Sequence, residues 1–133
     1  MTFWILAALA LYIVQLLSAP GLRYITGGIK QIAYGLGAHD KPAKSSVIDA
    51  RLSRAAENMK ESMPIFLALA LLAEMNGISS GLAVQGAMVF VLARLVYIPA
   101  YVSAVFGLRS LVWTIAMGGM VMMLVGIWPS LAL

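Results

Sequence analysis

The stretch RLSRAAENMKESMPIF (residues 51–66) leads a row of charged and polar side chains directly into an uncharged run. Arg51, Arg54, Asn58 and Glu61 recur at helical spacing and fall within an arc of about 80° on one helix face. The chain then carries no charge for more than three helical turns. Ionisable groups at the mouth of a membrane helix are costly and usually face a partner, a cavity or a ligand. We therefore expect the functional site at this stripe.

The composition indicates an integral membrane protein of the all-α class. Of the 133 residues, 62% are hydrophobic and only 11% are charged, whereas soluble domains have about 45–50% apolar and about 25% charged residues. The chain has no cysteine, which excludes disulfides, iron–sulfur clusters, zinc–thiolate sites and a cysteine nucleophile. Any thiol chemistry must therefore use a thiol of the substrate. The net charge of +4 reflects membrane topology, and we expect no nucleic-acid partner.

Long apolar runs predict a single domain, residues 1–133, of four transmembrane helices in an up-and-down bundle, because each run reaches the roughly 20 residues that a span needs. The first run should end at Pro20-Gly21, a pair that breaks helices. Ser46 and Asp49 fit a capping box at the start of the second. Gly118-Gly119 could permit close helix contact in the fourth. The predicted helices are residues 2–22, 46–76, 82–106 and 110–131, with a long loop over 23–45.

The positive charges predict the orientation of these helices. Arg109 lies between the third and fourth helices, and seven further cations precede the apolar part of the second: Arg23, Lys30, Lys41, Lys44, Arg51, Arg54 and Lys60. Neither terminus nor the turn over residues 76–81 carries Lys or Arg. The positive-inside rule then places both loops in the cytoplasm and both termini outside.

The third helix brings a second polar group. Arg94, Tyr97 and Tyr101 share an arc of about 60°, and Arg109 follows at the end of that helix or in the next turn. This group belongs to the cytoplasmic half, at the depth where the stripe of the second helix enters the membrane. Two polar faces at one depth on adjacent helices predict a shared polar pocket, within or between subunits.

A purely structural interpretation of these residues is also open. Glu61 and Arg94 could pair to tie two helices together, with Asn58 satisfying the leftover hydrogen bonds. Tyr97 and Tyr101 could be aromatic residues of the membrane interface. One glutamate does not balance three arginines, however, and an anionic ligand would supply the missing negative charge.

Two spaced motifs follow each other along the predicted second and third helices: Arg54-x-x-x-Asn58-x-x-Glu61-x-x-Pro64-x-Phe66, then Arg94-x-x-Tyr97-x-x-x-Tyr101 with Arg109 after it. With these motifs, its length and its four predicted spans, the chain resembles the MAPEG family over nearly its whole length. This family of membrane-associated proteins in eicosanoid and glutathione metabolism includes microsomal glutathione transferases and leukotriene C4 synthase.

The resemblance implies a homotrimer that binds glutathione as co-substrate between neighbouring subunits and acts on hydrophobic electrophiles from the bilayer, in a bacterial inner membrane. Arg109 is then the catalytic candidate, which stabilises the glutathione thiolate. The implied glutathione contacts are Arg54, Asn58, Glu61, Arg94, Tyr97 and Tyr101.

This sequence departs from the leukotriene synthase at a few positions. Ala56 and Ser62 stand where that synthase has a glutamine and a tyrosine that touch the ligand, and Arg109 lies one residue further from Tyr101. Arg23 or Lys30 could replace a first-helix arginine. A non-catalytic scaffold or accessory subunit with the same fold is therefore the alternative function.

Two other functions are disfavoured by the sequence. A small transporter is less consistent with a chain that has no charge in the middle of its first or fourth helix. His39 has no second histidine or cysteine to share a metal, so we expect no metal site.

Overall fold

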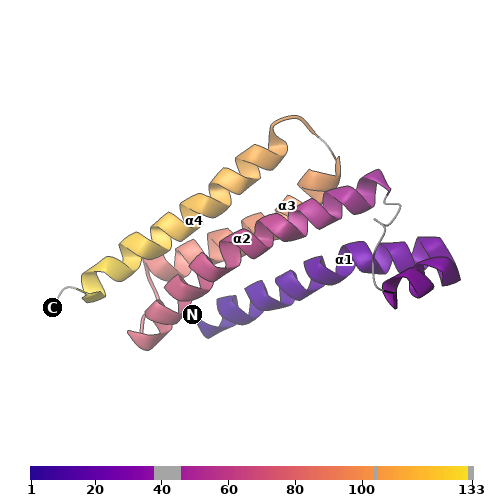
Figure 1. Cartoon of the computed structure of the whole chain (residues 1–133). Coiled ribbons are helices and arrows are strands. Elements are labelled where there is room, and N and C mark those ends of the chain that lie inside the picture. Colours follow the sequence, from indigo (N-terminus) through magenta and orange to yellow (C-terminus); the bar gives the residue numbers. More distant parts are fainter. Residues whose placement is uncertain (38–45, 104, 132–133) are drawn as a thin grey trace.

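The computed structural model describes residues 1–37, 46–103 and 105–131, and within these ranges every regular element is a helix (Figure 1). The four helices are α1 (Thr2–Gly35), α2 (Val47–Met75), α3 (Leu82–Ser103) and α4 (Leu108–Leu131). They lie along one another in alternating directions. The start of α1, the α2–α3 turn and the end of α4 lie at one end, which we call the terminal end (Figure 1). The start of α2, the end of α3 and the start of α4 lie at the other, which we call the loop end.

Three of these helices are long and apolar enough to cross a membrane: residues Thr2–Lys30 of α1, Leu82–Ser103 of α3 and Leu108–Ser130 of α4. This agrees with a multi-pass membrane protein. Among the described residues, α2 does not meet the same criterion, because the charged stripe occupies its first half and Glu74 lies near its end. A fourth span therefore stays a prediction.

The first helix is longer than the sequence predicts. We expected it to end at Pro20-Gly21, with a loop over residues 23–45, but the helical segment reaches Gly35. Pro20 removes only one backbone donor and its fixed φ is helical, and membrane helices tolerate such residues. The predicted loop was therefore wrong up to Gly35. His39 and its neighbours lie outside the described residues.

The break in α1 falls at Gly28 instead. Its φ of 58° and ψ of −153° are open to glycine and costly for other residues. Beyond this residue the helix turns back (Figure 1), so that a side chain added at Gly35 would meet the Tyr24 ring. Gly28 therefore folds the last turns of α1 onto the preceding helix instead of extending the span.

Polar contacts at both ends fix α1 against α2. At the loop end, Arg23 Nε lies 2.6 Å from the buried Asp49 Oδ2. At the terminal end, Thr2 Oγ1 donates to Glu74 Oε1 at 2.8 Å. The predicted cap of α2 is confirmed, since Ser46 Oγ accepts a hydrogen bond from the Asp49 amide at 3.1 Å. These contacts set the register of the antiparallel α1–α2 pair.

The terminal half of the α2–α3–α4 bundle is closely packed. A Cβ on Gly119 would lie 2.7 Å from the Gly86 carbonyl oxygen, so the α3 and α4 backbones touch there. Gly118, the other member of the predicted pair, faces open space. Between α2 and α3, the Phe66 and Phe90 rings stack with centroids 4.4 Å apart. The backbones of α3 and α4 therefore make close contact in this half.

At the loop end, α3 and α4 differ slightly from the predicted bounds. α3 is helical to Ser103, and α4 begins at Leu108 after Gly107, whose φ is 76°. Arg109 therefore lies in the first turn of α4, where it can face α2 and α3.

Candidate functional site

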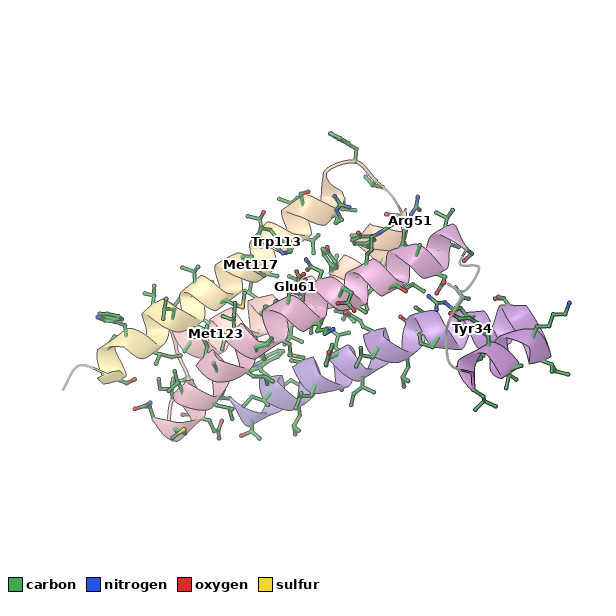
Figure 2. All side chains as sticks on the ribbon, in the orientation of Figure 1. Tyr34, Arg51, Glu61, Trp113, Met117 and Met123 are labelled. Carbon is green, nitrogen blue, oxygen red and sulfur yellow. The ribbon has the colours of Figure 1, made fainter. Side chains whose placement is uncertain are left out.

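The loop half of the bundle contains a cavity of about 590 Å³ between α2, α3 and α4. Figure 2 shows Glu61 on α2 and Trp113 on α4, the two helices that form its outer walls. We call this the central cavity. Its lining residues are Arg54, Glu57, Asn58, Glu61, Tyr97, Tyr101, Arg109, Ser110, Trp113 and Thr114.

The α2 wall carries both signs of charge. Arg54, Glu57 and Glu61 are exposed at the edge of the cavity, and Asn58 is half-buried. Glu57 lies 3.5 Å from the exposed Lys60, a surface pair that contributes little to stability. Within the described ranges, Arg54 and Glu61 form no ion pair. Their charges are therefore available to a ligand.

The α3 and α4 walls place an arginine against two tyrosines. Tyr97 is buried and its ring centroid lies 5.5 Å from that of Tyr101. Arg109 Cζ lies 5.2 Å from the Tyr101 centroid, within the range of a cation–π interaction. Tyr101 therefore helps to hold the Arg109 guanidinium in the cavity, although Arg109 itself is exposed.

Arg94 does not line the central cavity, unlike the other six predicted site residues. Its side chain is fully buried and donates hydrogen bonds to Asn58 Oδ1 and, at 2.8 Å, to Ser62 Oγ. Phe90 and Tyr97 flank its guanidinium, with centroids 5.4 and 5.3 Å from Cζ. In this structure Arg94 therefore positions Asn58. Among the described residues it forms no ion pair with Glu61, and its side chain is not exposed to solvent.

Four residues line the central cavity although the sequence did not predict them there: Glu57, Ser110, Trp113 and Thr114. The helical period offered a signal for two of them: Glu57 is three residues after Arg54, and Trp113 is four after Arg109, so each lies near its partner on the same helix face. The start of α4 was predicted two residues late, at 110, which obscured this face. The position of Ser62 also has a role that the sequence did not indicate, because its hydroxyl accepts a hydrogen bond from Arg94.

The candidates for a first-helix arginine lie away from the central cavity. Arg23 pairs with Asp49 and approaches Ser53 Oγ at 3.4 Å. Lys30 is exposed on the segment beyond Gly28. Neither side chain contributes to the cavity wall.

A second cavity of about 380 Å³ adjoins the first at the loop end. It shares Arg54, Tyr101, Arg109 and Ser110 with the central cavity. Arg51 lines this second cavity but not the central one. Arg51 donates a hydrogen bond to the Val102 carbonyl oxygen at 2.8 Å. We call this second cavity the arginine pocket.

The central cavity can hold a small molecule that carries both signs of charge. The guanidinium groups of Arg54 and Arg109 suit carboxylates, which they can bind in a bidentate manner. The carboxylates of Glu57 and Glu61 suit an ammonium group. Trp113 adds an apolar surface on the α4 side. The cavity therefore favours an amphoteric ligand over a simple anion.

Comparison with known proteins identifies the family. The MAPEG family model matches residues 1–128, a segment that contains every residue of both cavities. A comparison with curated proteins finds no match. Because the family model covers nearly the whole chain, this protein belongs to the MAPEG family.

Proposed function

We propose that this protein binds glutathione in the central cavity and transfers its thiolate to hydrophobic electrophiles that reach the site from the bilayer. The observation that carries the proposal is the joint presence of Arg54, Arg109, Glu57 and Glu61 around one cavity. Glutathione has two carboxylates, one ammonium group and a thiol, so its charges complement this set. The cavity volume of about 590 Å³ lies within the range of about 300–1,000 Å³ that small-molecule sites occupy.

In this proposal the α2 and α3 side chains orient the tripeptide. Arg54 binds one of its carboxylates, and Glu61 or Glu57 receives its ammonium group. Asn58, whose side-chain oxygen is held by Arg94, keeps its amide N–H groups for the ligand. Tyr97 and Tyr101 form the inner wall. All of these residues lie on α2 or α3, and placement on helices favours a preorganised site.

Arg109 is the proposed catalytic residue because its guanidinium can stabilise the thiolate. An ordinary thiol has a pKa of about 8.5, and a neighbouring guanidinium favours the charged form. Lowering that pKa by about two units needs roughly 2.7 kcal/mol of differential stabilisation. The thiolate would then form a sulfur–carbon bond to an electrophilic carbon, or attack a peroxide oxygen, and the displaced electron pair would leave with the other atom of the broken bond.

We further propose a trimer of four-span subunits with both termini outside a bacterial inner membrane. Exposed charges on α2, notably Arg54 and Glu61, are costly beside lipid. A neighbouring subunit would cover them and close the cavity. The distribution of Lys and Arg supports the orientation.

Calorimetry with the detergent-solubilised protein tests glutathione binding. We expect saturable binding, with a rise in ultraviolet thiolate absorbance when glutathione is added at neutral pH. S-methylglutathione is the matched control, because it keeps the charged groups but has no ionisable thiol. It should bind without the absorbance change. The absence of both binding and thiolate absorbance with glutathione would refute the proposal.

A non-catalytic scaffold is the second candidate function. The observation that favours it is the burial of Arg94 and Ser62, which contact each other and Asn58 in the bundle interior. In this role the α2 and α3 polar side chains would tie helices or subunits together.

The substitution Arg109→Ala separates the two functions. The transferase proposal expects a large loss of turnover, a higher thiol pKa in the bound state and an unchanged oligomer by size-exclusion chromatography with light scattering. The scaffold role expects either no effect on any of these or a loss of assembly.

A further inference from the structure

The arginine pocket includes side chains that the proposed glutathione site does not use, notably Arg51, Val105 and Phe106. Its residues come from the start of α2, the end of α3 and the start of α4. Figure 2 shows Arg51 on α2 at the loop end, beside the α3–α4 connection. The lining residues are Arg51, Arg54, Ala100, Tyr101, Val105, Phe106, Gly107, Arg109 and Ser110.

Three guanidinium groups meet in this pocket without an acidic neighbour in its lining. Of the contacts that the structure gives for the described residues, Arg51 has the Val102 carbonyl and Arg109 the Tyr101 ring. No ion pair joins Arg51, Arg54 or Arg109 to a described carboxylate. The carbonyl contact restrains Arg51 while leaving most of its N–H donors unused. The positive charge and the free N–H donors of the pocket therefore favour the binding of an anion.

The start of α4 strengthens this preference. Ser110 belongs to the first turn of α4, where backbone N–H groups lack helical partners and the helix dipole is positive. This first turn contains no acidic residue. The partial positive charge at the start of α4 would thus add to the attraction of an anion by the guanidinium groups.

The rim of the pocket is apolar and exposed. Phe106 is fully exposed and Val105 is 55% exposed, both at the connection between two candidate spans. Large apolar side chains at this level of a membrane protein suit the interface between headgroups and acyl chains. A purely water-soluble anion would make no use of this rim, whereas an anion attached to an acyl chain would.

We propose that the arginine pocket binds the phosphate headgroup of an acidic phospholipid, whose acyl chains lie against Val105 and Phe106. Basic pockets between membrane helices on the cytoplasmic side suit such headgroups, and the loop end carries the positive charge of the chain. The proposal goes beyond glutathione binding and does not depend on it. Because Arg54 and Arg109 border both cavities, the bound headgroup would form part of the wall between them.

Lipid retention by the full chain tests the proposal. The protein is reconstituted in nanodiscs of equal phosphatidylglycerol and phosphatidylcholine, extracted in mild detergent and examined by native mass spectrometry. We expect retained phosphatidylglycerol to exceed phosphatidylcholine. Arg51→Gln should lower this enrichment about fivefold, the factor associated with one basic side chain near an acidic membrane. Lys30→Gln is the matched control, because it removes the same charge from an exposed site outside the pocket.

A second variant keeps the test decisive if Arg51→Gln assembles poorly. Phe106→Ser changes a fully exposed side chain, should leave folding intact and should also reduce the enrichment. Equal enrichment in wild type and in both variants would overturn the proposal.

Two competition arms distinguish the source of the anion. Glycerol 3-phosphate has the same phosphate chemistry but no acyl chains. At a concentration equal to that of the phosphatidylglycerol, it should not displace the retained lipid. Full displacement would mark a site for soluble phosphates and overturn the lipid assignment. Complete loss of the lipid on addition of glutathione would assign the pocket to the glutathione site and also overturn the proposal.

Discussion

The two halves of the α2–α3–α4 bundle use the same helices for opposite purposes. In the terminal half, Gly86 and Gly119 bring the backbones of α3 and α4 into contact, and Phe66 stacks on Phe90. In the loop half, the same helices are separated by two cavities with arginine in both linings. Small and aromatic residues close one half, whereas long charged residues keep the other open.

The boundary between the halves is the hydrogen-bonded group of Arg94, Asn58 and Ser62. Arg94 and Arg109 have the same charge and lie on adjacent helices, but Arg94 is sealed between two rings and Arg109 faces a cavity. This contrast shows that motif membership does not decide whether an arginine side chain is buried or open to a cavity. Its neighbours in the third dimension do.

Removing Arg94 should give the largest effect, since it breaks the boundary. Arg94→Ala leaves a core cavity and deprives Asn58 and Ser62 of their donor, so we expect at least about 3 kcal/mol of destabilisation. Thermal unfolding in detergent measures it. Arg94→Met, which fills most of the volume, should recover part of the stability without restoring glutathione affinity, because Asn58 stays unheld.

A structural role for Arg94 and a direct ligand contact by Arg94 predict different results in this experiment. If Arg94→Ala unfolds at the wild-type temperature yet binds glutathione weakly, Arg94 contacts the ligand directly and does not form a structural boundary between the two halves.

A pair of adjacent glycines tests the closed half. A Cβ at Gly119 would lie 2.7 Å from the Gly86 carbonyl oxygen and 2.8 Å from the Phe90 nitrogen, whereas one at Gly118 would meet nothing within 4 Å. Gly119→Ala should therefore destabilise the protein by about 2 kcal/mol through overpacking. Gly118→Ala should be neutral or slightly stabilising, since alanine favours helix. Equal unfolding midpoints for the two variants would show that α3 and α4 do not touch there.

Replacing Arg54 tests the open half. Arg54→Gln removes a charge that no described carboxylate balances, so folding should be unaffected. The dissociation constant of glutathione should rise about tenfold, equivalent to about 1.4 kcal/mol. Calorimetry measures it, and Lys30→Gln is the charge-matched control, because Lys30 is exposed and lines neither cavity. A similar loss with Lys30→Gln would indicate a general charge effect instead of a binding site.

Much of the architecture and most of the candidate site were predictable from the sequence for physical reasons. Composition and long apolar runs predict membrane helices, because lipid selects strongly for both. Helical spacing brings Arg54, Asn58 and Glu61 onto one face, and the structure places all three along one cavity. Local chemistry at the start of α2 was equally readable, as the Ser46 cap shows.

Other features depend on contacts that spacing does not contain. Arg94 shares its helix face with Tyr97, but only the packing of Phe90 and Ser62 around it makes it inaccessible. The sequence predicted the end of α1 too early, at about residue 22. Pro-Gly pairs end helices in soluble proteins, where water can hydrogen-bond the backbone groups that are freed, but membrane helices continue through such pairs. The role of Trp113 required the start of α4 to be known.

The smallest expected effect concerns the cap where α2 enters the loop half. Ser46→Ala removes the acceptor of the Asp49 amide and should lower the free energy of unfolding by about 1 kcal/mol. Ser46→Asp should retain wild-type stability, because aspartate caps helices as well as serine does. Thermal unfolding of the three proteins in one detergent measures both changes. Glutathione affinity should not move, since Ser46 lies about two turns before Arg54.

This cap also reports how the open half is anchored. Asp49 is bound twice, through its amide to Ser46 and through its carboxylate to Arg23. If Ser46→Ala unfolds like the wild type, the ion pair alone fixes the first turn of α2. If it weakens glutathione binding without lowering stability, the first turn must move as a unit with Arg54. The position of Arg54 would then depend on the contact of α2 with α1 through Arg23, and not on the contact of α2 with α3 through Arg94.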